Sequence, residues 1–160
     1  MELSEILTRE RIRVPLDPAD KLGVITQLID LLAATGGLRD RDAALDAILK
    51  REAKGTTGIG YGLAIPHAKT PGCDRLVIAV GKPAAPVDFQ SLDGRPVTFV
   101  VLLLSPPDQP GPHLQALAKI SRLMNIEDFR NAVSNAATAD ALYQAILAHE
   151  SAEVPGRAGV

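Results

Sequence analysis

The sequence predicts a three-layer α/β fold, in which a mixed β-sheet of about five strands carries helices on both faces. Segments with apolar residues at helical spacing alternate with short apolar runs, although not in a strict strand–helix–strand rhythm. Residues 75–104 contain consecutive strand-like runs joined by turns, which favours a mixed sheet. The run Val97–Leu104 is hydrophobic on both faces and is therefore typical of a central, doubly covered strand.

Two helices are expected in the first third of the chain. Apolar residues recur at helical spacing from about Asp20 to Thr35, which predicts one buried helical stripe. Asp17 is expected to cap this helix, with Pro18 at its first position, where the missing N–H costs nothing. A second helix is expected from about Arg41 to Lys54, ending at a glycine.

The middle of the chain reads as loop and strands. Residues 55–62 form a loop dense in glycine, and a short strand that stops at a proline follows it. The expected strands are Leu63–Pro66, Arg75–Val80 and Val97–Leu104, with weaker candidates at Val14–Leu16 and Val87–Phe89.

The last third is predicted to be helical. A rigid loop with four prolines, Ser105–Pro112, leads into helices expected at His113–Met124, Glu127–Ser134 and Ala139–Ala148. Residues 1–150 are expected to form a single domain, and residues 151–160, which are small and contain proline and glycine, a disordered tail.

Charge and composition exclude several classes of function. Seventeen basic and nineteen acidic residues give a net charge of −2, which argues against binding to nucleic acid or to an anionic membrane surface. No apolar run is long enough to insert into a membrane, and the N-terminus does not resemble a signal peptide, so we expect a cytoplasmic protein. The single cysteine excludes a disulfide framework and a cysteine zinc site, and no cofactor is expected.

The glycine-rich loop does not match a nucleotide-binding motif. The dinucleotide fingerprint fails because Leu63 stands where its last glycine belongs, and the P-loop fails because Tyr61 replaces its lysine. Both motifs also lie between a strand and a helix, whereas this loop follows a helix. The loop is either a tight crossover or a place where the backbone closely approaches another group.

Two histidines are candidates for one site. His67 follows a proline at the end of a strand, and His113 opens a helix after the loop that follows Val97–Leu104. If these strands are parallel, the two imidazoles converge at one edge of the sheet, where α/β proteins usually bind ligands. A helix start also favours anions, so the pattern indicates an anion or phosphoryl site. His149 and Cys73 are assigned no role.

Three stretches of the sequence resemble a known family. They are Arg51-Glu52, the string TGIGYGLAIPH that ends at His67, and His113-Leu114. Together they resemble the enzyme IIA domains of the fructose–mannitol class (type 2) of the bacterial phosphoenolpyruvate-dependent phosphotransferase system, including the nitrogen-regulatory branch. The resemblance covers nearly the whole chain. Tyr61 and Ala68 depart from residues frequent in the family. Neither change removes a functional group, so they concern the choice of partner more than the ability to transfer a phosphoryl group.

This resemblance implies a phosphotransferase that acts as a phosphohistidine relay. His67 would accept a phosphoryl group from the phosphocarrier HPr, on Nε2, and pass it to an enzyme IIB component for fructose-type sugar uptake. Arg51 and His113 match the family's other active-site residues, and no metal is needed. Arg51 could equally cap its helix or pair with a carboxylate, and His113 could simply bind its own loop.

Three functions remain open at this stage. The first is the sugar-uptake relay just described. The second is a regulatory module of the nitrogen type, in which phosphorylation of His67 controls binding to target proteins without sugar transfer. The third is a protein that binds a metal or a small anion through His67 and His113, although no spacing typical of a metal site supports it.

Overall fold

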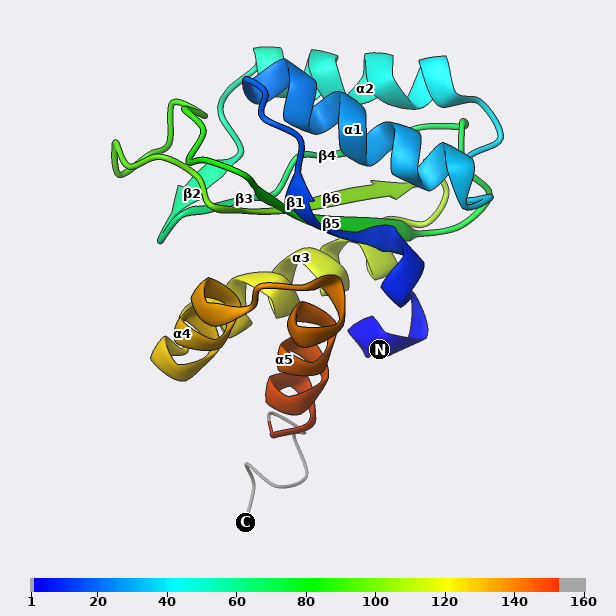
Figure 1. Ribbon diagram of the computed structural model, residues 1–160. Coiled ribbons are helices and arrows are strands. Elements are labelled where there is room, and N and C mark those ends of the chain that lie inside the picture. The colour runs from blue at the N-terminus through cyan, green and yellow to red at the C-terminus, as the bar shows by residue number, and fades with distance from the viewer. Residues whose placement is uncertain (1, 153–160) are drawn as a thin grey trace.

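The computed structural model of the chain describes residues 2–152. Helices α1 (Lys21–Ala34) and α2 (Arg41–Ala53) cover one face of the sheet, and α3 (Pro110–Met124), α4 (Glu127–Asn135) and α5 (Ala139–Ala152) lie on the other (Figure 1). Two short 3-10 helices, η1 (Leu3–Glu5) and η2 (Arg9–Arg11), precede the first strand. The predicted three-layer α/β fold class is confirmed.

The sheet is mixed and has six strands, where about five were expected. They are β1 (Ile12–Leu16), β2 (Gly58–Gly60), β3 (Leu63–Ala64), β4 (His67–Lys69), β5 (Val77–Pro83) and β6 (Phe99–Ser105). Their order is β1-β5-β6-β3-β2, and β4 also pairs with β6. Strand β6 runs antiparallel to β5 but parallel to β3 and β4. It is therefore the central strand, as its two apolar faces predicted.

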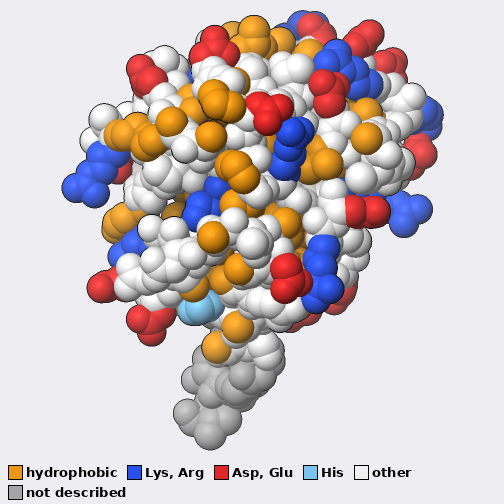
Figure 2. Space-filling model, in the orientation of Figure 1, with side chains coloured by type: hydrophobic (Ala, Val, Ile, Leu, Met, Phe, Trp, Pro, Cys, Tyr) orange, Lys and Arg blue, Asp and Glu red, His pale blue; other side chains and the backbone are white. Residues whose placement is uncertain are grey.

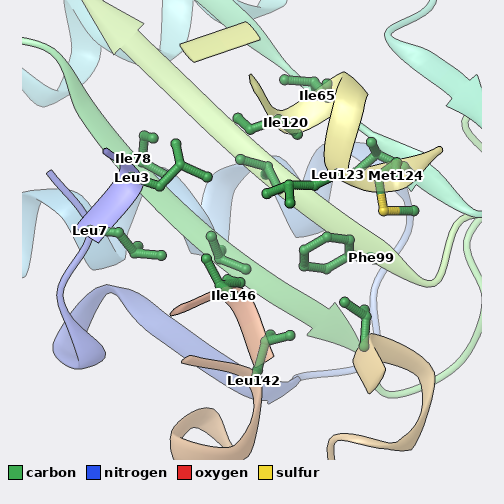
Figure 3. Close-up of a cluster of buried hydrophobic side chains, with 14 of the residues drawn as sticks. Leu3, Leu7, Ile65, Ile78, Phe99, Ile120, Leu123, Met124, Leu142 and Ile146 are labelled. Carbon is green, nitrogen blue, oxygen red and sulfur yellow. The ribbon is translucent and has the colours of Figure 1, made fainter. Parts of the chain in front are cut away.

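Two hydrophobic cores sandwich the central strand. Phe99, Val101 and Leu103 of β6 point into the core beneath the sheet, which Figure 3 shows packed with side chains of α3, α5 and the N-terminal segment. The alternate residues of β6, Val100, Leu102 and Leu104, point into the core under α1 and α2. Because hydrophobic side chains cover both faces of this strand, its position in the molecule is fixed by packing on either side.

The start of helix α1 differs from the expectation. Asp20, not Asp17, is the N-cap, because its carboxylate accepts the Gly23 N–H at 2.9 Å. The backbone of Asp17 is bound by the side-chain amide of Gln27, which accepts the Asp17 N–H at 2.8 Å and donates to its carbonyl at 3.0 Å. These two bonds hold Asp17 outside the helix, so Pro18 precedes the cap.

Other boundaries move where tertiary pairing competes with local pattern. Val87–Phe89 is not a strand, because only Val87 pairs, in an isolated bridge with Val97. Helix α3 begins at Pro110, inside the expected proline loop, and α5 continues to Ala152, so the first two residues of the expected tail are helical. Residues 153–160 of that tail lie outside the described residues. No helix within residues 2–152 has the length and apolar character needed to cross a membrane.

Candidate functional site

Residue His67 opens strand β4 instead of ending the sheet. The expectation that pairing stops at Pro66 was wrong, because β3 and β4 both run parallel to β6 and only Ile65 and Pro66 separate them. Proline cannot donate a hydrogen bond, but the Pro66 carbonyl accepts the Leu103 N–H at 2.9 Å. His67 is then paired in register with Leu103, which holds its backbone in the sheet.

The imidazole of His67 is held in one tautomer. Its Nδ1 lies 2.7 Å from the carbonyl oxygen of Ile65. A carbonyl only accepts, so Nδ1 carries the proton and Nε2 keeps its lone pair. Partial burial is the main cause that lowers the pKa of His67, and the charge of Arg51 lowers it further. The ring is therefore neutral near pH 7, with Nε2 ready to act as a nucleophile.

The second histidine, His113, lies against the first. The ring centroids of His67 and His113 are 5.6 Å apart, in an edge-on arrangement with an interplanar angle of 60°. This convergence arises because β4 and β6 are parallel, as the sequence argument required. His113 sits in the first turn of α3, which is separated from the end of β6 by four residues, so both rings lie at this end of β6.

Burial sets the charge state of His113, and a serine binds one of its ring nitrogens. The residue is 4% exposed, and its Nδ1 lies 2.6 Å from Oγ of Ser105, the last residue of β6. Burial, followed by the charges of His67 and Lys69, lowers the pKa of His113 to about 4. Its ring is thus neutral under ordinary conditions. If the Ser105 hydroxyl donates to Nδ1, the ring proton resides on Nε2.

Helix α2 brings the positive charge of Arg51 into the neighbourhood of His67. Arg51 lies in the last turn of α2, and its guanidinium donates to the Gly55 carbonyl at 2.9 Å. No carboxylate within residues 2–152 forms an ion pair with Arg51, and its charge acts on His67, whose pKa it lowers. Arg51 therefore binds a carbonyl just beyond the end of its helix, and its guanidinium is a permanent charge of the kind that binds anions.

Glutamate 52 ties the glycine-rich loop to α1 and α2. Its carboxylate accepts the N–H of Thr57 at 3.0 Å and the hydroxyl of Thr57 at 2.5 Å, and it forms an ion pair with Lys21 at 2.8 Å. The Thr57 carbonyl in turn accepts the Ile65 N–H at 3.0 Å. A chain of contacts thus runs from Glu52 through Thr57 to Ile65, whose own carbonyl orients His67.

The glycine-rich loop is built for packing rather than for cradling a phosphate. It contains strand β2, which pairs with β3, so the expectation of a plain loop was incomplete. Three of its amides bind other residues of the protein: those of Thr57, Gly58 and Tyr61 donate to side chains of Glu52, Thr56 and Asp93. At Gly58 any side chain would collide with Ser91, which explains the need for glycine there.

The N-terminus of α3 offers less to an anion than expected. Pro110 and Pro112 occupy two of its first three positions and have no N–H groups. The site is therefore made of side chains: two neutral imidazoles, one guanidinium and the exposed ammonium-bearing Lys69, which follows His67 by two residues in β4. Period-two alternation along a strand could have identified Lys69 from the sequence.

The remaining candidates lie elsewhere. Cys73 is 1% exposed, and burial raises the pKa of its thiol to about 11, which disfavours the reactive thiolate. The Nδ1 of His149 lies 2.9 Å from the Ala145 carbonyl of its own helix, and the ring packs on Phe129. Within residues 2–152 no group of three His, Cys, Asp or Glu side chains is placed to hold a metal ion.

Three curated relatives illustrate what the chain is similar to. It is 40% identical over 129 residues to the fructose-specific EIIA component of Haloferax volcanii, covering 81% of this chain and 84% of that protein. It is 36% identical over 147 residues to a nitrogen regulatory protein of Pseudomonas aeruginosa, covering 92% and 96%. Against the fructose-specific EIIABC component of Bacillus subtilis, the identity is 37% over 94% of this chain, which spans only 24% of that longer protein.

Solved structures agree with the sequence relatives. The crystal structure of the nitrogen regulatory protein IIA-Ntr from Neisseria meningitidis superimposes with a TM-score of 0.79 at 25% identity, covering 90% of this chain and 98% of that one. The IIA mannitol structure from Escherichia coli superimposes with a TM-score of 0.74 at 17% identity, covering 88% and 98%, and shows the shared fold. Residues 5–149 also match the family described as "Phosphoenolpyruvate-dependent sugar phosphotransferase system, EIIA 2". Sequence family, fold and relatives thus agree, and the chain belongs to the EIIA 2 family of the phosphoenolpyruvate-dependent sugar phosphotransferase system.

Proposed function

We propose that the protein relays a phosphoryl group through His67, which accepts it on Nε2 from phospho-HPr and passes it to an enzyme IIB component. The observation that carries this proposal is the hydrogen bond from Nδ1 of His67 to the Ile65 carbonyl. It leaves the Nε2 lone pair free, in a ring whose pKa is lowered and which is therefore neutral. A neutral imidazole is the form that attacks phosphorus.

In the transfer step, His67 exchanges one bond to phosphorus for another. The Nε2 lone pair of His67 forms the new N–P bond while the bond between phosphorus and the donor atom of phospho-HPr breaks, and that electron pair leaves with HPr. The phosphorylated ring then carries positive charge, which the Ile65 carbonyl stabilises through the Nδ1 proton. The same charge makes the ring a good leaving group when the phosphoryl moves on.

Two neighbours would stabilise the charge on the transferring group. The guanidinium of Arg51 offers a permanently charged fork that matches phosphoryl oxygens. His113 would donate from Nε2, because Ser105 hydrogen-bonds its Nδ1 and its lowered pKa keeps the ring neutral. Phosphoryl transfer is promoted mainly by such positioning and charge stabilisation.

The acceptor separates two versions of this function. One relative is named a fructose-specific EIIA component, which supports transfer to an enzyme IIB component for fructose-type uptake. Other relatives are named nitrogen regulatory proteins, which supports the alternative in which phosphorylation of His67 controls binding to target proteins without sugar transfer. Both versions use the same histidine site.

Labelling from phosphoenolpyruvate tests the relay. The protein is incubated with enzyme I, HPr and labelled phosphoenolpyruvate, and we expect one acid-labile, base-stable phosphoryl group per chain, which is lost in His67→Ala. His149→Ala is the matched control, because it also removes an imidazole but lies on α5, and it should label fully. Full acid-labile labelling of His67→Ala would refute the assignment. Adding an enzyme IIB component then tests sugar transfer, which should drain the label only in the transport version.

A further inference from the structure

A second site lies at the opposite end of the central strand. A groove of about 620 Å³ is bordered by the β2–β3 turn at Tyr61 and Gly62, by the segment that follows β5, and by α4. It contacts Phe99, the first residue of β6, whereas Ser105 at the other end binds His113. At about 3.3 Å per residue, six steps separate Phe99 from Ser105 and four separate it from Leu103, which pairs with His67, so the groove lies about 13–20 Å along the strand from the histidine site. Its volume falls within the usual range for small-ligand sites, about 300–1,000 Å³.

The groove concentrates positive charge on a protein whose net charge is negative. Lys82, Arg95 and Arg130 line it, and no Asp or Glu is among the described residues that do. Figure 2 shows Lys and Arg side chains along this flank, at the left of the view. The Lys82 ammonium donates to three backbone carbonyls at the end of α4, so it contributes charge while its donors are occupied. The groove therefore attracts anions.

Two guanidinium groups remain able to bind such an anion. The guanidinium of Arg95 makes no ion pair or hydrogen bond within residues 2–152; only its backbone N–H is used, by Asp93. Arg130 donates from one nitrogen to the Met124 carbonyl and keeps its other donors. Its guanidinium lies 4.2 Å from the centre of the Tyr61 ring, which positions the charge at the groove wall. Arginine forks match phosphate oxygens in pairs of hydrogen bonds.

The aromatic wall of the groove is held at a conformational cost. Tyr61 has φ 55° and is 57% exposed, an unfavourable backbone for a residue with a side chain. The Asp93 carboxylate accepts the Tyr61 N–H at 3.2 Å and so retains this conformation. Burial does not compensate the strain, because the ring faces solvent and Arg130. Strain at an exposed aromatic residue is typical of a binding surface rather than of a core.

The neutral part of the lining suits a hydroxylated ligand. The side chains of Thr98, Asn131 and Ser134 can donate to or accept from hydroxyl groups, and no hydrogen bond within residues 2–152 uses them. Most of the remaining wall is apolar, from Pro83 to Pro86, at Pro96, and at Phe99, Met124 and Val133. Two arginine forks, three neutral polar groups and an apolar wall together match a sugar carrying phosphate. We propose that this groove binds a sugar phosphate, at a site separate from the phosphoryl-transfer histidines.

Titration with fructose 1,6-bisphosphate tests the proposal. We expect saturable binding by calorimetry, with amide shifts at Arg95, Thr98 and Asn131 in NMR spectra of the full chain. Arg95→Gln should weaken the affinity at least tenfold. Arg75→Gln is the matched control, because it removes the same charge from an exposed arginine that does not line the groove, and it should bind as wild type does. Neither variant should change labelling at His67.

Four outcomes would overturn the proposal: no saturable binding, equal affinity in Arg95→Gln, equal weakening by Arg75→Gln, or inorganic phosphate binding as tightly as the bisphosphate. Binding of a hexaglutamate peptide but not of the bisphosphate would instead assign the groove to an acidic protein segment. Because His67 labelling is measured in the same samples, failure of this site is distinguishable from failure of the relay.

Discussion

Replacing Glu52 by alanine tests the framework behind the histidine site. The carboxylate is 6% exposed, binds Thr57 twice, and pairs with Lys21. Without it, the amide and hydroxyl of Thr57 lose their acceptor, and the loop that binds Ile65 is released. Lys21 still donates to the side-chain oxygen of Gln90 at 3.1 Å and is partly solvated. Losing its ion pair with Glu52 therefore destabilises the protein less than losing the bonds to Thr57.

The expected loss of stability in Glu52→Ala follows from those contacts. Hydrogen bonds to a charged group contribute about 1.5–3 kcal/mol each, and breaking a buried pair from one side costs about 3–5 kcal/mol. We therefore expect Glu52→Ala to lower the free energy of unfolding by about 3–5 kcal/mol. Glu52→Gln keeps an oxygen acceptor, so about 1–2 kcal/mol is expected. For a chain of this size each kcal/mol shifts Tm by about 2–4 °C.

Urea unfolding and the labelling rate together measure this prediction. Phosphorylation of His67 should slow by about tenfold in Glu52→Ala, because misplacing Ile65 misplaces the ring. Asp46→Ala is the control, because Asp46 pairs with Lys50 on the exposed face of the same helix and should cost about 0.3–0.5 kcal/mol. If Glu52→Ala is no less stable than Asp46→Ala, the reasoning fails.

Three further predictions concern stability. The pKa of His113 in the folded state is lowered to about 4, so between about pH 4 and 6.5 the folded state binds fewer protons than the unfolded state. The free energy of unfolding should therefore fall as the pH drops from about 6.5 to 4. His113→Gln should reduce this pH dependence in unfolding titrations. Lys82→Met removes three hydrogen bonds to the end of α4 and should cost about 2 kcal/mol by urea unfolding; a wild-type midpoint would contradict this. Asp20→Ala should lower the free energy of unfolding by about 1 kcal/mol, and Asp17→Ala by less than about 0.5 kcal/mol, as measured by thermal unfolding. The reverse order would restore Asp17 as the cap.

Local patterns were sufficient wherever one periodicity dominated. The helical stripes predicted α1 and α2 to within a few residues, and the continuous apolar run from Val97 predicted the central strand β6. Pattern failed where a side chain far along the chain competes for the backbone. Gln27 binds the backbone of Asp17, which therefore lies outside the helix. Val97 pairs with Val87 in an isolated bridge, and β6 begins only at Phe99.

The histidines show the same division within the site. The sequence predicted His67 and His113 at strand and helix ends, and made their convergence conditional on parallel strands. The pairing of β4 with β6 met that condition. Ser105 was placed in a loop by the prolines that follow it, and Glu52 entered only through the stretch Arg51-Glu52. The bonds of these residues to His113 and Thr57 depend on how the strand, the loop and the helices pack.

The sequence by itself determined the fold class, the family resemblance and the candidate residues His67, His113 and Arg51, because periodicity and motif order are local properties of the chain. Only the tertiary structure decided which nitrogen of His67 is free, that burial lowers the pKa of His113, and that Lys82, Arg95 and Arg130 share one groove. A tautomer depends on the atom opposite the ring, a pKa on burial, and a groove on elements distant in sequence, and none of these is encoded by spacing along the chain.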